Sequence, residues 1–145
     1  MAMRWIHEVT PTWDDDKARI VGDAPAGIFD GRLGEMSRGA LVAAEWWRVE
    51  DEGRTVGFGS LDVVWGDAEI LLATAPDARE RGVGTFIIEH LVVEARARGL
   101  RYVYNLVQPN HPEAERVTTW LRERGFEEAR DGRLRRGVSA QGSSN

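Results

Sequence analysis

The residues best suited to chemistry in this sequence form a short run of arginine and glycine, "RERGVG", from Arg79 to Gly84. A loop of this composition between a strand and a helix directs several backbone N–H groups into one concavity at the positive end of the helix dipole. Gly82 and Gly84 lack the Cβ atoms that would keep a bulky diphosphate away from the backbone. Arg79 and Arg81 add fixed positive charge beside it, so the run predicts a phosphate-binding loop.

Other interpretations of this run compete with that prediction. Glycine also breaks a chain before a helix, and arginines at such a break are often solvated surface residues. A Walker loop requires Gly-Lys-Ser/Thr, which the sequence lacks, and a dinucleotide fingerprint requires Gly-x-Gly-x-x-Gly in a parallel βαβ unit. The order here is Arg-x-x-Gly-x-Gly, and it follows strands that predict an antiparallel meander, so neither of these nucleotide-binding classes fits.

Composition and charge set the class of the protein. The sequence has 145 residues, of which 42% are hydrophobic, and this suits one compact domain with a proper core. A formal net charge of −5 argues against binding nucleic acid or an anionic membrane through the overall field. The chain has no cysteine, and His7, His90 and His111 show no metal-ligand spacing, so we expect no metal site. The longest apolar run, "FIIEHLVV", is too short to span a bilayer, and the start lacks a signal-peptide core, so we expect a cytoplasmic protein.

Apolar periodicity predicts strands and helices within a single domain. Two β-prone runs are joined by the turn "EDEGR", in which Gly53 is available for a positive φ angle, and they predict a hairpin that a third run extends. Between Gly82 and Arg98, apolar residues recur at helical spacing and predict a helix that Gly99 ends. A strand, a second helix and a last hairpin follow. The predicted strands are 4–9, 41–49, 55–65, 69–74 and 100–107, the domain spans 1–138, residues 24–38 show no clear periodicity, and we expect a disordered tail at 139–145.

Capping residues predict where two helices begin. The segment "PTWDDDKARIV" is typical of a short helix with Thr12 as its N-cap and three solvated aspartates in its first turn. Asn110 and Glu113 make a capping-box-like start for a helix that runs to Arg124, with Gly125 as its terminator.

The run "RERGVG" and its surroundings resemble the GNAT superfamily of N-acetyltransferases, whose phosphate loop has the pattern Gln/Arg-x-x-Gly-x-Gly/Ala between its fourth strand and a central helix. The resemblance extends from about Trp46 to about Phe126, over "WWRVEDEGRTVGFGSLDVV", "AEILLATAPDARERGVGTF", "LRYVYNLV" and the helix that ends in "RGF". It implies an α/β class and a single-domain GNAT-like fold. In that fold a mixed, mainly antiparallel sheet is splayed between strands 4 and 5 and flanked by helices.

The resemblance also implies that acetyl-coenzyme A binds as a co-substrate, with its pyrophosphate on the backbone from Glu80 to Thr85. Its pantetheine arm would pair with strand backbone at Leu72 and Thr74, in the gap between the splayed strands. Asn110 occupies a place where the family often has an asparagine that contacts pantetheine, and a role as N-cap is the alternative. The implied cofactor-binding residues are Leu72, Ala73, Thr74, Arg79, Glu80, Arg81, Gly82, Val83, Gly84, Thr85 and Asn110.

For the chemistry, the resemblance implies direct attack of an acceptor amine on the acetyl carbonyl and points to Glu69 as the general base. Some family members use a glutamate near the start of this strand, where partial burial raises its pKa; the alternative is a solvent-facing strand residue. The family's usual general acid, a tyrosine four residues before the Gly of the terminal Gly-Phe pair, is replaced by Leu121. Leu121 falls on the apolar stripe of its helix, so we expect it in the core.

The sequence therefore predicts an acyl-CoA-dependent N-acetyltransferase that acts on an amine of a small molecule or a protein. The alternative is a non-catalytic acetyl-coenzyme A-binding sensor or regulatory module, which the missing tyrosine favours. Trp46, Trp47 and Trp65 could stack on a cationic acceptor, although tryptophans on strands usually pack in a core. The sequence identifies neither the acceptor, the general acid nor the oligomeric state, and it does not separate acetyl from longer acyl groups.

Overall fold

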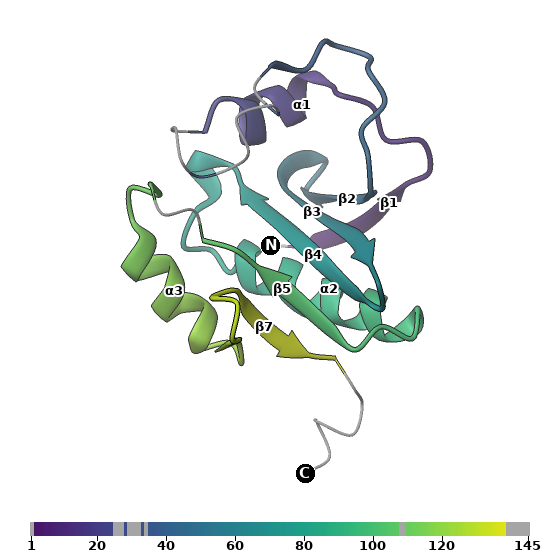
Figure 1. Cartoon of the computed structure of the whole chain (residues 1–145). Helices are drawn as coiled ribbons and strands as arrows, with labels where there is room; N and C mark the ends of the chain where they lie inside the picture. The colour runs from purple at the N-terminus through teal and green to yellow at the C-terminus, as the bar shows by residue number, and fades with distance from the viewer. Residues whose placement is uncertain (1, 25–27, 29–32, 34, 108–109, 139–145) are drawn as a thin grey trace.

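A single mixed β-sheet forms the centre of the computed structural model, which describes residues 2–24, 28, 33, 35–107 and 110–138. The strands of this sheet lie in the order β1-β2-β3-β4-β5-β7-β6 (Figure 1). They are β1 (Met3–Glu8), β2 (Glu45–Asp51), β3 (Arg54–Val64), β4 (Asp67–Thr74), β5 (Tyr102–Asn105), β6 (Glu127–Glu128) and β7 (Leu134–Gly137). The helices are α1 (Asp15–Lys17), its π-helical continuation η1 (Ala18–Gly22), the 3₁₀ turn η3 (Pro76–Ala78), α2 (Val83–Ala97) and α3 (Ala114–Arg122). The predicted α/β class is confirmed, while the predicted tail and much of the stretch 24–38 lie outside the described residues.

β2, β3 and β4 form the antiparallel meander that the sequence predicts, and β1 adds a fourth antiparallel strand to it. β2 pairs with β3, β3 pairs with β4, and β1 lies along the other edge of β2. Gly53 has the expected positive φ, +81°, in the turn between β2 and β3. Trp46 and Trp47 are 2% and 1% exposed, so they belong to the core as expected. Trp65 is 93% exposed because it lies in the turn between β3 and β4, so for this tryptophan the core interpretation is wrong.

The second half of the sheet begins with a change of strand direction. After α2 the chain returns as β5, which is parallel to β4 because the helix carries the chain back along the sheet. β7 then pairs antiparallel with β5, and β6 pairs antiparallel with β7. The predicted last hairpin is therefore confirmed, and it extends the sheet beyond β5.

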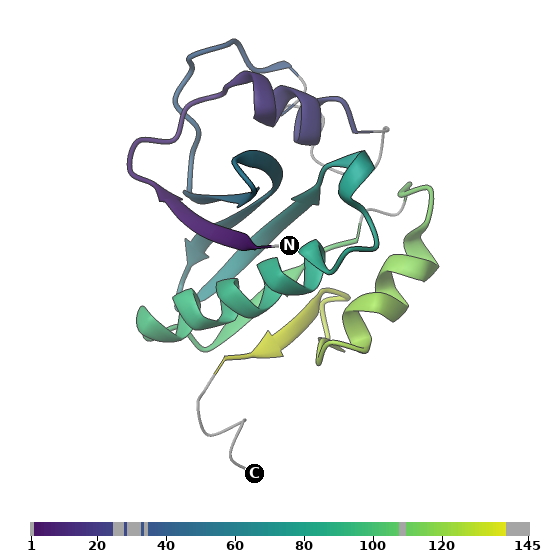
Figure 2. The same ribbon diagram turned by 180° about the vertical axis from the view of Figure 1, so that it is seen from behind.

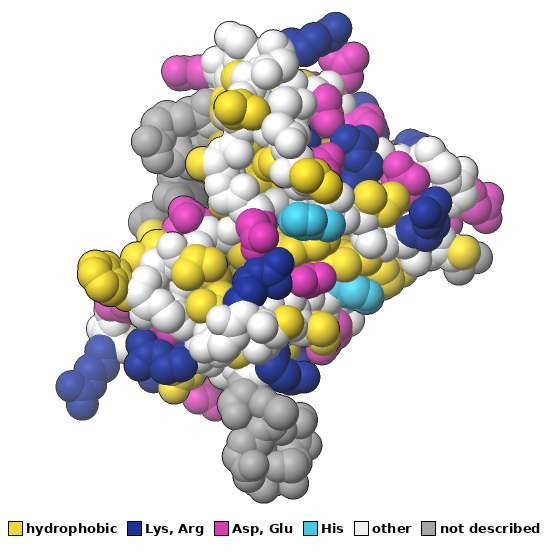
Figure 3. Space-filling model, turned by 90° about the vertical axis from the view of Figure 1, so that its right-hand side faces the viewer, with side chains coloured by type: hydrophobic (Ala, Val, Ile, Leu, Met, Phe, Trp, Pro, Cys, Tyr) yellow, Lys and Arg dark blue, Asp and Glu magenta, His cyan; other side chains and the backbone are white. Residues whose placement is uncertain are grey.

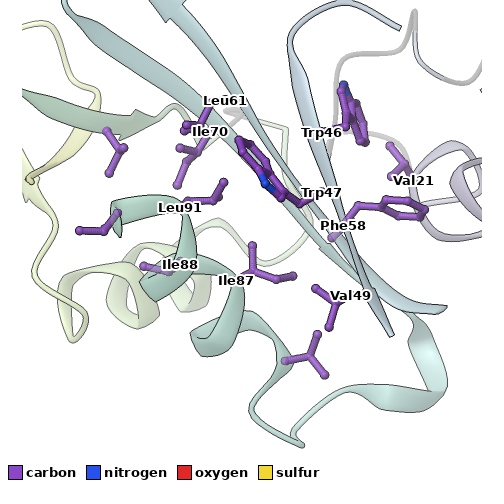
Figure 4. Packing of buried hydrophobic residues seen from close by; sticks show 14 of the residues in the cluster. Val21, Trp46, Trp47, Val49, Phe58, Leu61, Ile70, Ile87, Ile88 and Leu91 are labelled. Carbon is purple, nitrogen blue, oxygen red and sulfur yellow. The ribbon is translucent and has the colours of Figure 1, made fainter. Parts of the chain in front are cut away.

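One face of the sheet is covered by α2, with α3 beside it (Figure 2). Ile87, Ile88 and Leu91 of α2 are fully buried. Figure 4 shows these three side chains gathered with Trp47 and Ile70 of the sheet. The apolar stripe predicted for this helix is therefore the stripe that packs against the strands.

Two glycines of β3 let α2 lie directly on the sheet backbone. A Cβ atom at Gly57 would stand 2.8 Å from the carbonyl oxygen of Ala73 and 3.0 Å from Cγ1 of Val83. A Cβ atom at Gly59 would stand 2.9 Å from Cγ2 of Ile87. Carbon atoms normally stand about 3.5–4.0 Å from non-bonded neighbours, so only glycine admits the helix this closely.

α1 and η1 lie on the other face of the sheet. Ion pairs of Lys17 and Arg48 attach them to the strands. Lys17 is fully buried, its Nζ donates to Glu8 Oε1 at 2.6 Å, and it lies 5.0 Å from the centre of the Phe58 ring. Nη2 of Arg48 donates to Glu8 Oε2 at 2.8 Å and to Asp14 Oδ2 at 2.7 Å. Positive and negative side chains are also interleaved on the face of the molecule that Figure 3 shows.

The predicted cap of the first helix is wrong. Asp14, not Thr12, is the N-cap of α1, and its side chain accepts the Lys17 N–H at 2.8 Å. The aspartates of the first turn are also not all solvated, because Asp14 and Asp16 form ion pairs with Arg48. An acidic run next to a half-buried arginine therefore serves to attach the helix to the sheet.

The predicted start of the later helix is wrong as well. α3 begins at Ala114 with Glu113 at its N-cap position, so Asn110 lies too far upstream to cap it. The Glu113 N–H is instead accepted by Nδ1 of His111 at 2.9 Å. Leu121 is 1% exposed, which confirms its predicted place in the core.

We expect Gly57→Ala to lower the free energy of unfolding by about 2–3 kcal/mol, because its methyl group would press on a backbone carbonyl and on α2. The matched control is Gly137→Ala in β7, where a Cβ atom would stand an ordinary 3.8 Å from Tyr102 Cε1. That control should stay within about 0.5 kcal/mol of the wild type. Urea unfolding curves measure both variants, and equal stabilities would contradict the close packing of α2 on β3.

Candidate functional site

The parallel strands β4 and β5 pair over only part of their length. Their ladder ends where Glu69 stands opposite Tyr104, and no pairing between described residues of the two strands continues beyond that point. β4 itself runs on to Thr74 and keeps β3 on its other side, with Leu72 opposite Gly59. The stretch from Leu72 to Thr74 therefore presents an edge of backbone N–H and C=O groups that β5 does not occupy. This is the predicted splay between the fourth and fifth strands.

The loop "RERGVG" connects this edge to α2. Glu80 and Gly82 have left-handed φ angles of +62° and +84°, so the chain turns sharply at both residues. α2 begins at Val83, and its first helical hydrogen bond runs from the Phe86 N–H to the Gly82 carbonyl at 3.0 Å. The N–H groups between them have no acceptor within the helix. They lie at the positive end of a 15-residue helix, which favours an anion there.

The two glycines of the loop differ in their surroundings. A Cβ atom at Gly82 would meet no atom within 4 Å, so the loop is open there, and its φ of +84° favours glycine. Room for a diphosphate at this position stays a prediction. A Cβ atom at Gly84 would stand 3.0 Å from Cη2 and Cζ2 of Trp120. Gly84 therefore makes room for a side chain of the protein itself. Arg79 precedes the turn, Arg81 lies within it, and both are exposed, as a role in binding an anion requires.

Two side chains that sequence reasoning missed lie next to this loop. Trp120 belongs to α3, and Arg124 follows the end of that helix. Nε of Arg124 donates to Thr85 Oγ1 at 2.9 Å, and the guanidinium lies 4.0 Å from the centre of a Trp120 ring. Nη1 of Arg124 also donates to the Trp120 carbonyl at 2.9 Å. The guanidinium is thereby fixed at the first turn of α2, where it adds positive charge. The only sequence signal was the spacing of four residues, which would put both side chains on one face of the helix predicted to run to Arg124.

Three titratable side chains gather on one face of the sheet at the start of the splay. Glu69 stands opposite Asp62 of β3 on one side and opposite Tyr104 of β5 on the other. Burial raises the pKa of the Tyr104 hydroxyl, and the negative charges of Glu69 and Asp62 raise it further. The guanidinium of Arg133, 3.9 Å from the centre of the Tyr104 ring, opposes this shift without reversing it. The phenol of Tyr104 therefore keeps its proton at neutral pH.

The predicted base and the predicted pantetheine contact are both exposed. Glu69 is exposed, because this end of the β3–β4 hairpin projects into solvent. Of the two settings that the sequence left open, the structure agrees with the solvent-facing strand residue and not with the partly buried one. Val63 and Val64 of the same hairpin are 49% and 44% exposed. Asn110 is exposed in a turn ahead of α3, and its contact with pantetheine stays a prediction.

The structure brings the strand residues and the loop residues predicted for cofactor binding onto one continuous path. Leu72 and Thr74 lie on the free edge of β4, the buried Ala73 lies between them, and the residues from Glu80 to Thr85 follow after η3. In the part of the chain that the structure describes, no helix has the length and apolar character needed to cross a membrane.

Comparisons with known proteins agree with this geometry. The chain matches the family model "Acetyltransferase (GNAT) family" over residues 5–127, and no significant match is found among curated protein sequences. Its fold is similar to that of a putative acetyltransferase of the GNAT family from Desulfovibrio desulfuricans, with a TM-score of 0.65 and 17% identity over 95% of this chain and 100% of that chain. It is also similar to the ribosomal-protein-S18-alanine N-acetyltransferase from Escherichia coli, with a TM-score of 0.64 and 19% identity over 95% of both chains. The N-acetylglutamate synthase from Neisseria gonorrhoeae, solved with coenzyme A and N-acetyl-glutamate, gives a TM-score of 0.64 and 17% identity over 96% of this chain and 36% of that chain. Because the family model spans most of the sequence and the splayed sheet accompanies it, the chain belongs to the GNAT family of acetyltransferases.

Proposed function

We propose that this protein transfers an acetyl group from acetyl-coenzyme A to the amine of an acceptor. One observation carries the proposal: the free edge of β4 leads through η3 directly to the loop at the start of α2, which is suited to bind an anion. An extended arm with two amides and a diphosphate tail fits such a path. The coenzyme A in the similar Neisseria gonorrhoeae structure supports this choice of cofactor.

In this proposal the diphosphate lies on the backbone N–H groups from Glu80 to Thr85. The exposed Arg79 and Arg81 supply positive charge from the loop itself, and the fixed Arg124 supplies it from beside Thr85. Because Thr85 Oγ1 already accepts an N–H of Arg124, its own hydroxyl proton is available for donation to a phosphate oxygen. The pantetheine amides pair with Leu72 and Thr74.

The reaction that this arrangement supports is direct attack. The amine nitrogen forms a bond to the acetyl carbon, the bond between that carbon and sulfur breaks, and coenzyme A leaves as the thiolate. The nitrogen, which still carries one extra proton after attack, releases it to the departing thiolate or to water. Glu69 accepts the proton of the acceptor ammonium, directly or through a water, because only the neutral amine has a lone pair for attack. A backbone N–H from residues 72–74 donates to the carbonyl oxygen as negative charge develops on it.

Departure of the thiolate requires no acid at position 121. Leu121 is 1% exposed and has no proton to give. A free thiol has a pKa of about 8.5, so coenzyme A is a fair leaving group as the thiolate. The proposal therefore assigns no side chain as the general acid.

A non-catalytic role as an acetyl-coenzyme A sensor is the second candidate, and the core leucine in place of the usual tyrosine favours it. Release of free thiol from acetyl-coenzyme A separates the two functions. A catalytic site leaks slowly to water without an acceptor and releases thiol faster when a suitable amine is present. A sensor would bind the cofactor and release no thiol with any member of a broad amine panel.

We expect Gly82→Glu to weaken binding of coenzyme A at least about tenfold, because the new carboxylate adds bulk and like charge at the diphosphate position. The matched control is Gly132→Glu in the β6–β7 turn. Both glycines have a left-handed φ, +84° and +86°, and neither has an atom within 4 Å of the Cβ position. Both substitutions should therefore cost similar stability, and calorimetry should show lost affinity at position 82 alone. Unchanged affinity in a folded Gly82→Glu variant would place the diphosphate elsewhere.

We expect Glu69→Gln to lower the acetylation rate by about 10²–10⁴-fold at neutral pH, because glutamine keeps the shape of the side chain but is not basic. Affinity for coenzyme A should stay unchanged. The defect should shrink as pH rises toward the pKa of the acceptor amine, since more of the amine is then neutral in bulk water. Glu127→Gln, on an exposed glutamate of β6, is the control and should keep the full rate. A Glu69→Gln enzyme with the wild-type rate below neutral pH would leave Glu69 an ordinary strand residue.

A further inference from the structure

The side chain of Asn105, the last residue of β5, bridges to the neighbouring strand. Its Nδ2 donates to the carbonyl oxygen of Ile70 at 3.1 Å. Ile70 directly follows Glu69, the last residue of β4 that pairs with β5. The side-chain bond therefore stands where the backbone ladder between the two strands stops.

This bridge sets how far the two strands part. Strands joined by backbone hydrogen bonds stand about 4.8 Å apart. Here the side chain of Asn105 lies between the backbone of β5 and the Ile70 carbonyl of β4, so it holds the two strands farther apart. The backbone of Asn105 is meanwhile in register with Leu134 of β7. β5 therefore cannot close on β4 without disturbing its pairing on the other side, and the asparagine acts as a spacer.

The bridge also satisfies a polar group that the splay would otherwise leave without a partner. Ile70 is 3% exposed, and its carbonyl is the first on β4 beyond the paired segment. A carbonyl in such a place costs stability when it is unpaired, and that cost would favour closure of the two strands. With Asn105 as the donor, β4 can remain open from Leu72 to Thr74.

We propose that Asn105 is a positioning residue that keeps this edge of β4 open for the pantetheine arm of coenzyme A. The inference rests on the proposed function, because it requires that the arm occupy this edge. Asn105 acts through the Ile70 carbonyl and the strand spacing, not on the reacting atoms. It is a different residue from Asn110, to which the sequence pointed, and it lies within the sheet.

Two ligands test the proposal by isothermal titration calorimetry. Coenzyme A carries the pantetheine arm, whereas adenosine 3′,5′-bisphosphate carries only the nucleotide end. We expect Asn105→Leu, which is close in size but has no donor, to raise the Kd of coenzyme A by about three- to tenfold. The Kd of the bisphosphate should stay within about twofold, because the nucleotide end does not touch the splay. Asn105→Gln keeps the donor on a longer arm and should recover part of the lost affinity.

A matched control separates positioning from general loss of stability. Thr55→Val removes another part-buried hydrogen bond, the one that Arg48 donates to Thr55 Oγ1 at 3.1 Å, and it should leave both dissociation constants unchanged. Equal weakening of both ligands by Asn105→Leu, or wild-type affinity of this variant for coenzyme A, would overturn the inference. Those two outcomes concern only the Asn105 variant and leave the proposed function standing. A wild-type protein that fails to bind coenzyme A would instead overturn the proposed function, and this inference with it.

Discussion

The close approach of α2 to β3 is the constraint on which the rest of the candidate site depends. The space beside Gly57 is bounded by the carbonyl of Ala73, in the splayed part of β4, and by Val83, the first residue of α2. Because Gly57 has no side chain to separate β3 from α2, the strand and the helix are held at a fixed, short distance. The segment that connects β4 to α2 must therefore turn sharply, and it does so through left-handed residues. One of these is Glu80, at φ +62°, a conformation that costs a residue with a Cβ atom about 1–2 kcal/mol. Packing of the helix on the sheet therefore offsets the strain of the loop.

The opposite face of the sheet depends on charge. Burial alone would raise the pKa of the Asp14 carboxyl, but the hydrogen bond from the Lys17 N–H and the charges of Lys17 and Arg48 lower it below 3.8. A lowered folded pKa gives stability that is present above the unfolded pKa and is lost only as pH falls through the folded value, so α1 stays attached at neutral pH. Trp46 lies 5.5 Å from Nζ of Lys17. The sequence had suggested that Trp46 could stack on a cationic acceptor, but its ring already stacks on Lys17 of the protein.

Local patterns predicted those parts of the fold and the site that depend on local chemistry. Gly53 takes its positive φ in the predicted turn, and Gly82 takes one in the predicted phosphate loop, because a turn is specified by neighbouring residues. Asn105 and Trp120 were missed because their roles depend on distant partners. Asn105 bonds a carbonyl 35 positions away, and Trp120 fills the space above Gly84. No spacing in a sequence reveals which side chain will face a carbonyl where two strands part.

In the proposed function, recognition is divided between the main chain and the side chains. The proposed cofactor path uses N–H and C=O groups, which any sequence that keeps the splay and the loop can supply, and this agrees with shared folds at 17% and 19% identity. The side chains at the proposed acceptor end, Asp62, Glu69 and Tyr104, lie on one face of the strands, where substitution leaves the backbone path unchanged. Under this proposal, a change of acceptor needs only new side chains there, whereas a change of cofactor needs a different strand spacing. Leu121 fits this division, because a core leucine strengthens the packing of α3 and leaves the backbone path intact.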